Sequence, residues 1–317
     1  MPRRLFLPGA VTLAACSSSS SPSAPATDAA IVTDAASTET LDGADDTSLS
    51  DHVFGGARPV PYFYAPSGYD PSKPAPLILE LHGYSAGGYI EEIGFFQLHN
   101  FADANGYFVV APDGTVDSTN NRFWNATDTC CNFNGSTVDD VKYLTDLVDE
   151  VGKYYAIDPT RIYVVGHSNG GAMAYRLACD VPEKFAAIAA FAGPFWSDVS
   201  KCQPKVPIGV LSMHGTADTE VPYDGGTMSG ITEPSAPQVI ADWAKLDGCS
   251  ATADTSAPPI TLDQNQPTGA TTITRYPGCT APATVELWTL NGSGHIPGNL
   301  VSDFASRIWT FLQTHHR

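Results

Sequence analysis

The chain has few charged residues, and few of those are basic. Only 16% of its 317 residues are charged, with 34 acidic residues against 16 Lys and Arg, for a formal net charge of −18. Nucleic-acid binding needs Lys and Arg against phosphates, so this balance argues against a nucleic-acid partner. It also disfavours a polyanionic substrate. No stretch is long and apolar enough to span a bilayer, and no internal repeat is visible.

Paired C-x₂-C spacings are missing as well, which argues against a zinc site; no metal or cofactor is expected. The seven cysteines are Cys16, Cys130, Cys131, Cys179, Cys202, Cys249 and Cys279. Without Cys16 they form an even set of six, as expected for disulfides in an oxidising compartment.

Two features of spacing suggest how these six cysteines pair. Cys249 and Cys279 flank one insertion, so we expect them to bond each other. The adjacent pair 130–131 cannot readily form a bond within itself. We therefore expect these two to divide Cys179 and Cys202 between them, in an order that the sequence leaves open.

The first 50 residues predict export and a tether. Arg3-Arg4 precede the apolar stretch 5–15, and residues 13–16 (Leu-Ala-Ala-Cys) resemble the lipobox of bacterial lipoproteins. That resemblance implies residues 1–16 as signal and lipobox, lipid on Cys16, and an extracytoplasmic protein held to the membrane by its lipid. An ordinary signal peptide and a secreted protein remain open, as does twin-arginine rather than general export. The Ser/Ala/Thr-rich stretch 17–50 reads as a flexible tether before a domain over 51–317.

A serine with glycines two residues away on either side identifies the candidate nucleophile. Gly166-His167-Ser168-Asn169-Gly170 follows the apolar β-branched stretch 161–165 and opens the helix-prone stretch 171–178. A strand, a tight turn with serine at its tip and a helix form the context of a nucleophile elbow. A Cβ at either glycine would collide with neighbouring backbone in such a turn. We therefore expect Ser168 to be a catalytic nucleophile.

A serine nucleophile needs a base and a group that orients the base. In α/β-hydrolases the acid and then the histidine follow the serine along the chain. His295 is the one histidine after Ser168 that follows a strand, 284–290, and lies in a Gly-rich loop. Asp218 follows the apolar strand 208–213 in a turn, where α/β folds place functional groups. Asp224 remains as the second choice for the acid.

The oxyanion of the tetrahedral intermediate needs two backbone N–H donors. One is expected from Asn169, the residue after the nucleophile, and the other from Tyr84 in the loop that follows the strand 77–81. His82 in that loop is expected to have a structural role. Aromatic residues near these loops are candidates to line an acyl pocket.

Short apolar segments alternate with helical patterns from residue 54 onward, which predicts a mostly parallel sheet with helices on both faces. The expected strands are 61–65, 77–81, 108–111, 161–165, 187–191, 208–213 and 284–290. A closing helix is expected over 304–312. We expect one α/β domain of the α/β-hydrolase fold, and we expect it to be a monomer.

Six motifs recur in this order in one family. They are residues 81–84 (Leu-His-Gly-Tyr), 123–126 (Phe-Trp-Asn-Ala) with Cys130-Cys131, 138–141 (Val-Asp-Asp-Val), 166–171, 214–218 (His-Gly-Thr-Ala-Asp) and 294–295. From about Phe54 onward the chain resembles the polyhydroxybutyrate depolymerase-like and feruloyl esterases of α/β-hydrolase fold. The resemblance implies Ser168, Asp218 and His295 as the triad, and it implies Trp124 as a substrate contact.

The resemblance leaves the substrate open between feruloyl (hydroxycinnamoyl) esters and hydroxyalkanoate polyesters. A peptidase, a thioesterase or an acyltransferase would use the same three side chains. A surface binding module that has lost catalysis on this scaffold is the alternative outside enzymes.

Overall fold

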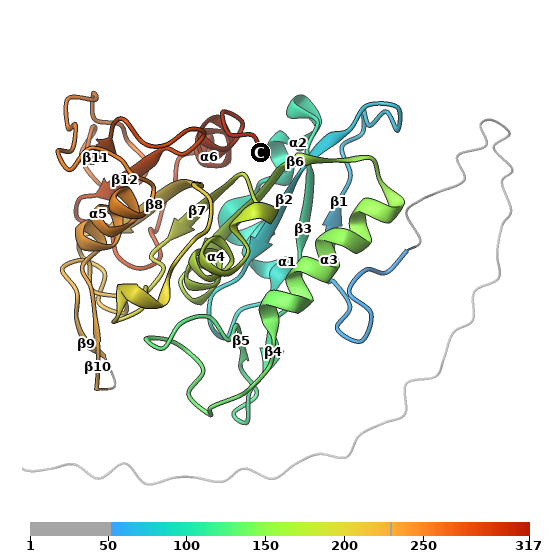
Figure 1. The fold of residues 1–317 in the computed structure, drawn as a ribbon, viewed down its shortest axis with the longest axis horizontal. Coiled ribbons are helices and arrows are strands. Elements are labelled where there is room, and N and C mark those ends of the chain that lie inside the picture. The colour runs from blue at the N-terminus through green and yellow to red at the C-terminus, as the bar shows by residue number, and fades with distance from the viewer. Residues whose placement is uncertain (1–51, 229) are drawn as a thin grey trace, which may run out of the picture. The chain divides into compact units, whose positions relative to one another are not determined.

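The computed structural model describes residues 52–228 and 230–317 (Figure 1). The predictions for the signal, Cys16 and the tether lie outside the described residues. The described chain is built on an eight-stranded sheet with the order β1-β3-β2-β6-β7-β8-β12-β11. The strands are β1 (Tyr62–Tyr64), β2 (Ala75–Leu81), β3 (Phe108–Ala111), β6 (Ile157–His167), β7 (Ala187–Phe191), β8 (Gly209–Gly215), β11 (Thr271–Tyr276) and β12 (Val285–Leu290).

The centre of the sheet is parallel and both edges are antiparallel. β1 pairs antiparallel with β3, and β11 pairs antiparallel with β12, while the six strands between pair in parallel. The predicted α/β-hydrolase fold is confirmed, and each of the seven expected strands is present. The edge strand β11 was not expected from the sequence. Only its alternate residues are buried, so its apolar signal is weak.

Helices cover both faces of the sheet. One face packs against α3 (Asp140–Tyr154), α4 (Asn169–Asp180) and α5 (Ala236–Leu246), and the other against α2 (His99–Asn105) and α6 (Phe304–Leu312) (Figure 1). β2 shows why both faces are apolar. Leu77, Leu79 and Leu81 point into the first layer and Ile78 into the second, because side chains alternate along a strand.

Short elements connect the strands at the carboxyl edge of the sheet. After β2 come α1 (Gly88–Glu91) and a π-helical turn, Glu92–Phe96; β4 (Thr115–Val116) and β5 (Arg122–Phe123) form one hairpin. β9 (Gly226–Met228) and β10 (Ile231–Glu233) form a second hairpin within the long connection that follows β8. That connection also holds α5 and β11, so it is a built part of the fold rather than a plain loop.

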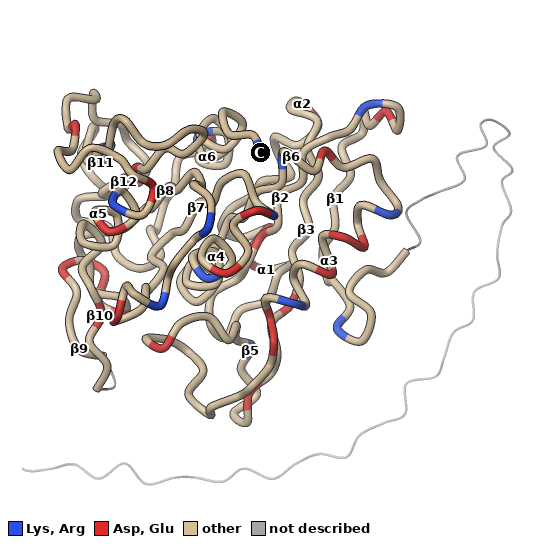
Figure 2. The backbone as a smooth tube through the Cα atoms, in the orientation of Figure 1, with Lys and Arg blue, Asp and Glu red and all other residues tan. Residues whose placement is uncertain are grey.

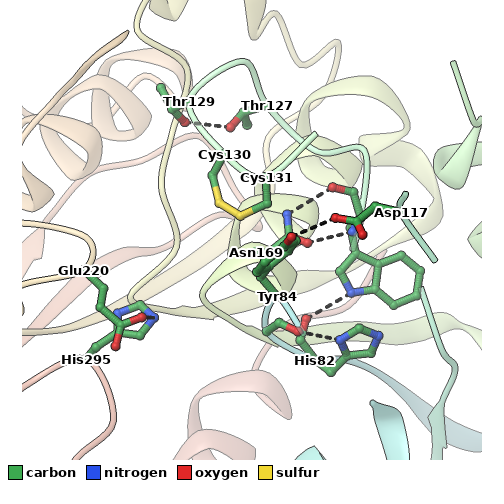
Figure 3. Close-up of a disulfide and its surroundings, with 12 residues drawn as sticks. His82, Tyr84, Asp117, Thr127, Thr129, Cys130, Cys131, Asn169, Glu220 and His295 are labelled. Atoms are coloured by element: carbon green, nitrogen blue, oxygen red, sulfur yellow. Dashed lines mark hydrogen bonds and ion pairs between the residues drawn. A yellow bond between two sulfur atoms is a disulfide. The ribbon is translucent and has the colours of Figure 1, made fainter. Parts of the chain in front are cut away.

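The disulfides differ in part from the pairing expected above. Cys249–Cys279 is confirmed. Cys179 in α4 bonds Cys202, with Cα atoms 5.0 Å apart, and the adjacent residues Cys130 and Cys131 bond each other across a cis peptide (Figure 3). The expected division of Cys179 and Cys202 between them was therefore wrong. Its physical reason is that the fold brings α4 and the segment after β7 within the usual separation of disulfide partners.

Charged residues are spread over many elements of the described chain, singly or in adjacent pairs. Figure 2 shows Lys and Arg positions separated along the backbone, with acidic residues between them. None of the helices over 52–228 and 230–317 is both long and apolar enough to cross a membrane.

Candidate active site

Ser168 stands at a sharp turn between β6 and α4. Its backbone has φ 54° and ψ −118°, a conformation outside the usual regions for a residue with a Cβ. A Cβ added to Gly166 would lie 2.2 Å from the carbonyl oxygen of Gly170. One added to Gly170 would lie 2.0 Å from that of Leu81. The two glycines are thus required by the close approach of backbone, and the geometry is that of a nucleophile elbow.

His295 lies beside Asp218 at the carboxyl edge of the sheet. Its Nδ1 is 2.8 Å from Oδ2 of Asp218, and both side chains are buried. Because a carboxylate only accepts, Nδ1 carries the proton of a neutral ring and Nε2 is left as the basic nitrogen. Nε2 lies 3.9 Å from a carboxylate oxygen of Glu220, which lines the same pocket as Ser168 (Figure 3). The basic nitrogen is therefore on the pocket side of the ring.

Asp218 is held as a carboxylate by donors on both of its oxygens. Oδ1 accepts from the backbone N–H groups of Glu220 and Val221, each at 2.9 Å. Oδ2 lies 3.2 Å from Nε2 of His214, in addition to its bond with His295. Burial alone would raise the pKa of Asp218, but the bonds from the two histidines outweigh it and lower the pKa below its ordinary value. The alternative acid, Asp224, is exposed.

Ser168 and His295 line one pocket of about 380 Å³. Its other walls are largely apolar. They include Ala86, Ile90, Gly94, Phe95 and Ile296.

Gly83 and Tyr84 form the side of this pocket next to the serine. Asn169 is the first residue of α4, so its N–H is one of the donors that a helix leaves without an internal partner. The structure thus brings the expected oxyanion segment and the elbow to one place. A larger cavity of about 530 Å³ lies elsewhere, lined in part by Cys130, Cys131 and Trp196.

Trp124 does not line the pocket. Its side chain has no exposed surface, and its indole N–H donates to the carbonyl of His82 at 3.0 Å. Its backbone N–H donates to the side chain of Asn169 at 2.6 Å, and the Asn169 amide donates back to the Trp124 carbonyl at 3.0 Å (Figure 3). The expected contact of Trp124 with substrate does not fit this burial. Trp124 instead joins the oxyanion segment to the residue after the nucleophile.

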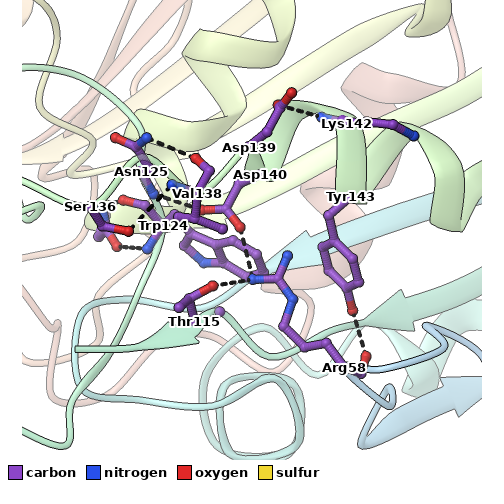
Figure 4. A network of polar contacts seen from close by, with 12 residues as sticks. Arg58, Thr115, Trp124, Asn125, Ser136, Val138, Asp139, Asp140, Lys142 and Tyr143 are labelled. Carbon is purple, nitrogen blue, oxygen red and sulfur yellow. Dashed lines mark hydrogen bonds and ion pairs between the residues drawn. The ribbon is translucent and has the colours of Figure 1, made fainter. Parts of the chain in front are cut away.

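The motif at 138–141 contacts Asn125, the residue after Trp124 (Figure 4). Asp140 is buried, pairs with Arg58 at 2.8 Å, and accepts from the backbone N–H of Asn125 at 2.8 Å. Asp139 caps α3 by accepting from the N–H of Lys142. A buried carboxylate of this kind would be costly if unpaired, so the pair with Arg58 and the bond to Asn125 fix the segment next to Trp124.

His82 has the structural role expected of it. Its Nε2 accepts from the N–H of Gly114 at 2.8 Å, and its Nδ1 donates to the carbonyl of Gly83 at 2.7 Å. Burial lowers the pKa of His82, so the ring stays neutral, as one donor and one acceptor require.

Besides Glu220, two acidic residues near the site were not identified from the sequence. Glu91, in α1, lies 3.0 Å from Nδ1 of His167. Glu233, in β10, is buried close enough to Asp218 for that charge to add to burial and raise the pKa of Glu233 to about 7. Neither belongs to a motif with a known spacing, and both reach the site only through tertiary folding.

Comparison with known proteins agrees with this geometry. A family model described as "Putative esterase" matches residues 54–238, more than half of the chain, with Ser168 and Asp218 inside the match. The chain belongs to this esterase family. This confirms the esterase family that the sequence predicted.

Relatives of this chain include proteins named feruloyl esterase and poly(3-hydroxybutyrate) depolymerase. Feruloyl esterase B of Piromyces equi is 30% identical over 242 residues, which are 74% of this chain and 42% of that protein. Feruloyl esterase C of Emericella nidulans is 29% identical, over 68% of this chain and 70% of the relative. Poly(3-hydroxybutyrate) depolymerase of Ralstonia pickettii is 34% identical over 157 residues, 47% of this chain and 31% of the relative. The chain spans less than half the length of the Piromyces equi relative.

A solved structure supports the fold assignment. Acetyl xylan esterase from Aspergillus awamori superposes with a TM-score of 0.53, covering 84% of this chain and 97% of that one at 16% identity. At this identity the likeness concerns the fold alone.

Proposed function

We propose that this esterase cleaves carboxylic esters through an acyl-enzyme on Ser168. His295 is the general base, and Asp218 orients it and balances the charge that the ring gains. The backbone N–H groups of Asn169 and Tyr84 stabilise the oxyanion. The observation that carries the proposal is the His295 ring, which bonds Asp218 through Nδ1 and shares a pocket with Ser168, a serine at a strained elbow.

The reaction follows from these positions. Ser168 Oγ attacks the ester carbonyl as Nε2 of His295 takes its proton, and the carbonyl oxygen becomes an oxyanion. Collapse of this intermediate breaks the bond to the alcohol, which leaves with the proton from His295. Water then enters, gives a proton to His295 and attacks the acyl-enzyme. The acid is released and the serine regains its proton.

The walls of the pocket favour an apolar acyl group. Ile90 and Ile296, which are 62% and 63% exposed, line it together with Phe95. A hydroxycinnamoyl group and a 3-hydroxyalkanoate chain both offer apolar surface to such walls. We propose one of these two as the substrate class, in line with the names of the relatives.

A comparison of Ser168→Ala with wild type on a substrate panel tests the proposal. The panel holds methyl ferulate, 3-hydroxybutyrate oligomers, short p-nitrophenyl esters and a peptide amide. We expect hydrolysis of at least one ester, and a loss in kcat of up to about 10⁶-fold in the variant. An enzyme that transfers acyl groups to added alcohols in preference to water would be an acyltransferase. Folded wild type that hydrolyses nothing but binds a ligand would be a binding module.

We further propose that the enzyme works outside the cytoplasm, held to a membrane by lipid on Cys16. More than one acyl chain makes such an anchor stable, and the tether at 17–50 would let the domain reach polymeric esters. Expression with radioactive palmitate tests this. Wild type should carry the label and fractionate with membranes, and Cys16→Ser should do neither. Unlabelled wild type in the soluble fraction would refute the anchor and leave the esterase proposal intact.

A further inference from the structure

Glu91 and His167 form a buried carboxylate–imidazole pair beneath the elbow, separate from the pair that Asp218 makes with His295. Oε1 of Glu91 lies 3.0 Å from Nδ1 of His167, close to it but without the alignment of a good hydrogen bond. The two side chains are only 6% and 5% exposed. Burial of two such groups is costly unless they compensate each other, so their neighbours matter for what the pair does.

The second atom of each side chain contacts another segment of the site. Oε2 of Glu91 accepts from the backbone N–H of Gly83 at 3.3 Å, next to the Tyr84 N–H that serves the oxyanion. Nε2 of His167 lies 3.3 Å from the backbone oxygen of His295. One pair thus contacts the oxyanion segment, the elbow and the histidine loop.

Packing fixes this pair in place. Phe95 stacks on the His167 ring with centroids 4.6 Å apart. A Cβ added to Gly83 would lie 3.3 Å from Nδ1 of His167 and 3.4 Å from Cβ of Ser168, so the oxyanion segment rests directly on the elbow. Both ring nitrogens of His167 face oxygen acceptors. The ring donates to both when it carries two protons.

We infer that Glu91 and His167 are positioning residues, which together hold the oxyanion donors, Ser168 and His295 at the separation that the transition state needs. This inference rests on the proposed function. A shift of about 1 Å at such a site lowers the rate by roughly 10²-fold, mostly in kcat, because ground-state binding needs less exact geometry.

The test compares Glu91→Gln, His167→Gln and the double variant on the best ester of the panel. Each single variant should lose about tenfold to a hundredfold in kcat with little change in KM. The double variant should lose no more than the worse single one, because the two residues act as a unit. Affinity for a boronic acid that forms a tetrahedral adduct should fall by the same factor as kcat/KM.

Glu92→Gln is the matched control. Glu92 is the next residue, is fully buried, and accepts from the backbone N–H groups of Leu98 and His99, away from the elbow. Its substitution should lower stability and leave kcat unchanged in the folded fraction. If Glu91→Gln does not fold, the affinity of His167→Gln for the boronic acid is the measurement that tests the inference.

Folded single variants with wild-type kcat and wild-type boronate affinity would overturn the inference, as would losses that simply add in the double variant. Activity that survives Ser168→Ala would instead refute the proposed function. The two failures are therefore distinguishable.

Discussion

At the scale of single residues, the site depends on a few hydrogen bonds with defined partners. Asp218 shows this best, because its four contacts come from two histidines and two backbone N–H groups. One carboxylate oxygen serves the turn and the other serves the histidines. A substitution that removes the charge of Asp218 but keeps its shape therefore tests its role in catalysis separately from its role in folding.

We expect Asp218→Asn to lower kcat on an ester by about 10⁴-fold, since an amide leaves His295 in the wrong tautomer. The fold should remain, because the amide oxygen still accepts from the turn. Asp224→Asn, on an exposed side chain in the same connection, should change kcat less than about twofold. Steady-state kinetics on both variants checks this. A larger loss at Asp224 would move the acid to that residue.

At the scale of elements, backbone contact between β2 and α4 makes the elbow possible. Gly170 permits this contact, and Gly166 permits the close backbone approach within the turn itself. The elbow could be expected from the sequence alone, because the motif, the strand before it and the helix after it are local signals. The contacts that the sequence could not give are those between segments far apart in the chain. Examples are the bond from Trp124 to Asn169 and the pair of Glu91 with His167.

Gly170→Ala should destabilise the protein by more than about 3 kcal/mol or prevent soluble expression, because its Cβ would lie 2.0 Å from the carbonyl oxygen of Leu81. Gly152 in α3 is the control, since a Cβ there meets nothing within 4 Å. Gly152→Ala should stabilise the protein by about 0.4–1 kcal/mol. Urea unfolding of both variants gives the two values. A well-folded Gly170→Ala of normal stability would show that β2 and α4 are not in this contact.

At the scale of the whole molecule, the strands of the sheet were predictable from the sequence, and the disulfide pairing was less so. Several of the seven expected strands, such as 108–111 and 187–191, are continuous apolar segments, which is typical of strands buried on both faces. Disulfide pairing depends on which loops meet in space. That is why Cys249–Cys279, which closes one insertion, was predictable and Cys179–Cys202 was not.

Asp247 makes global stability depend on pH. It is buried at the end of α5, and burial raises its pKa to about 7, against the smaller opposing effects of the Ile208 N–H and Arg317. Between pH 4 and 7 the unfolded chain has lost this proton while the native state keeps it. Stability therefore falls as pH rises through that window, by about 4 kcal/mol at most.

Asp247→Asn should remove this loss of stability. The stability of the variant relative to wild type should therefore rise between pH 5 and pH 8. Asp242→Asn, on the same helix, should follow the wild-type profile, since Asp242 bonds Gln238 at the surface. Urea midpoints at both pH values provide the measurement. Parallel profiles for Asp247→Asn and wild type would show that Asp247 does not titrate in this way.

Covalent labelling tests whether Ser168 is the nucleophile of an esterase. Wild type is treated with a fluorophosphonate, digested, and mapped by mass spectrometry. We expect one adduct per chain, on Ser168, formed in step with loss of ester hydrolysis, and none in Ser168→Ala. An adduct on any other residue, or complete loss of hydrolysis with Ser168 unmodified, would contradict this assignment.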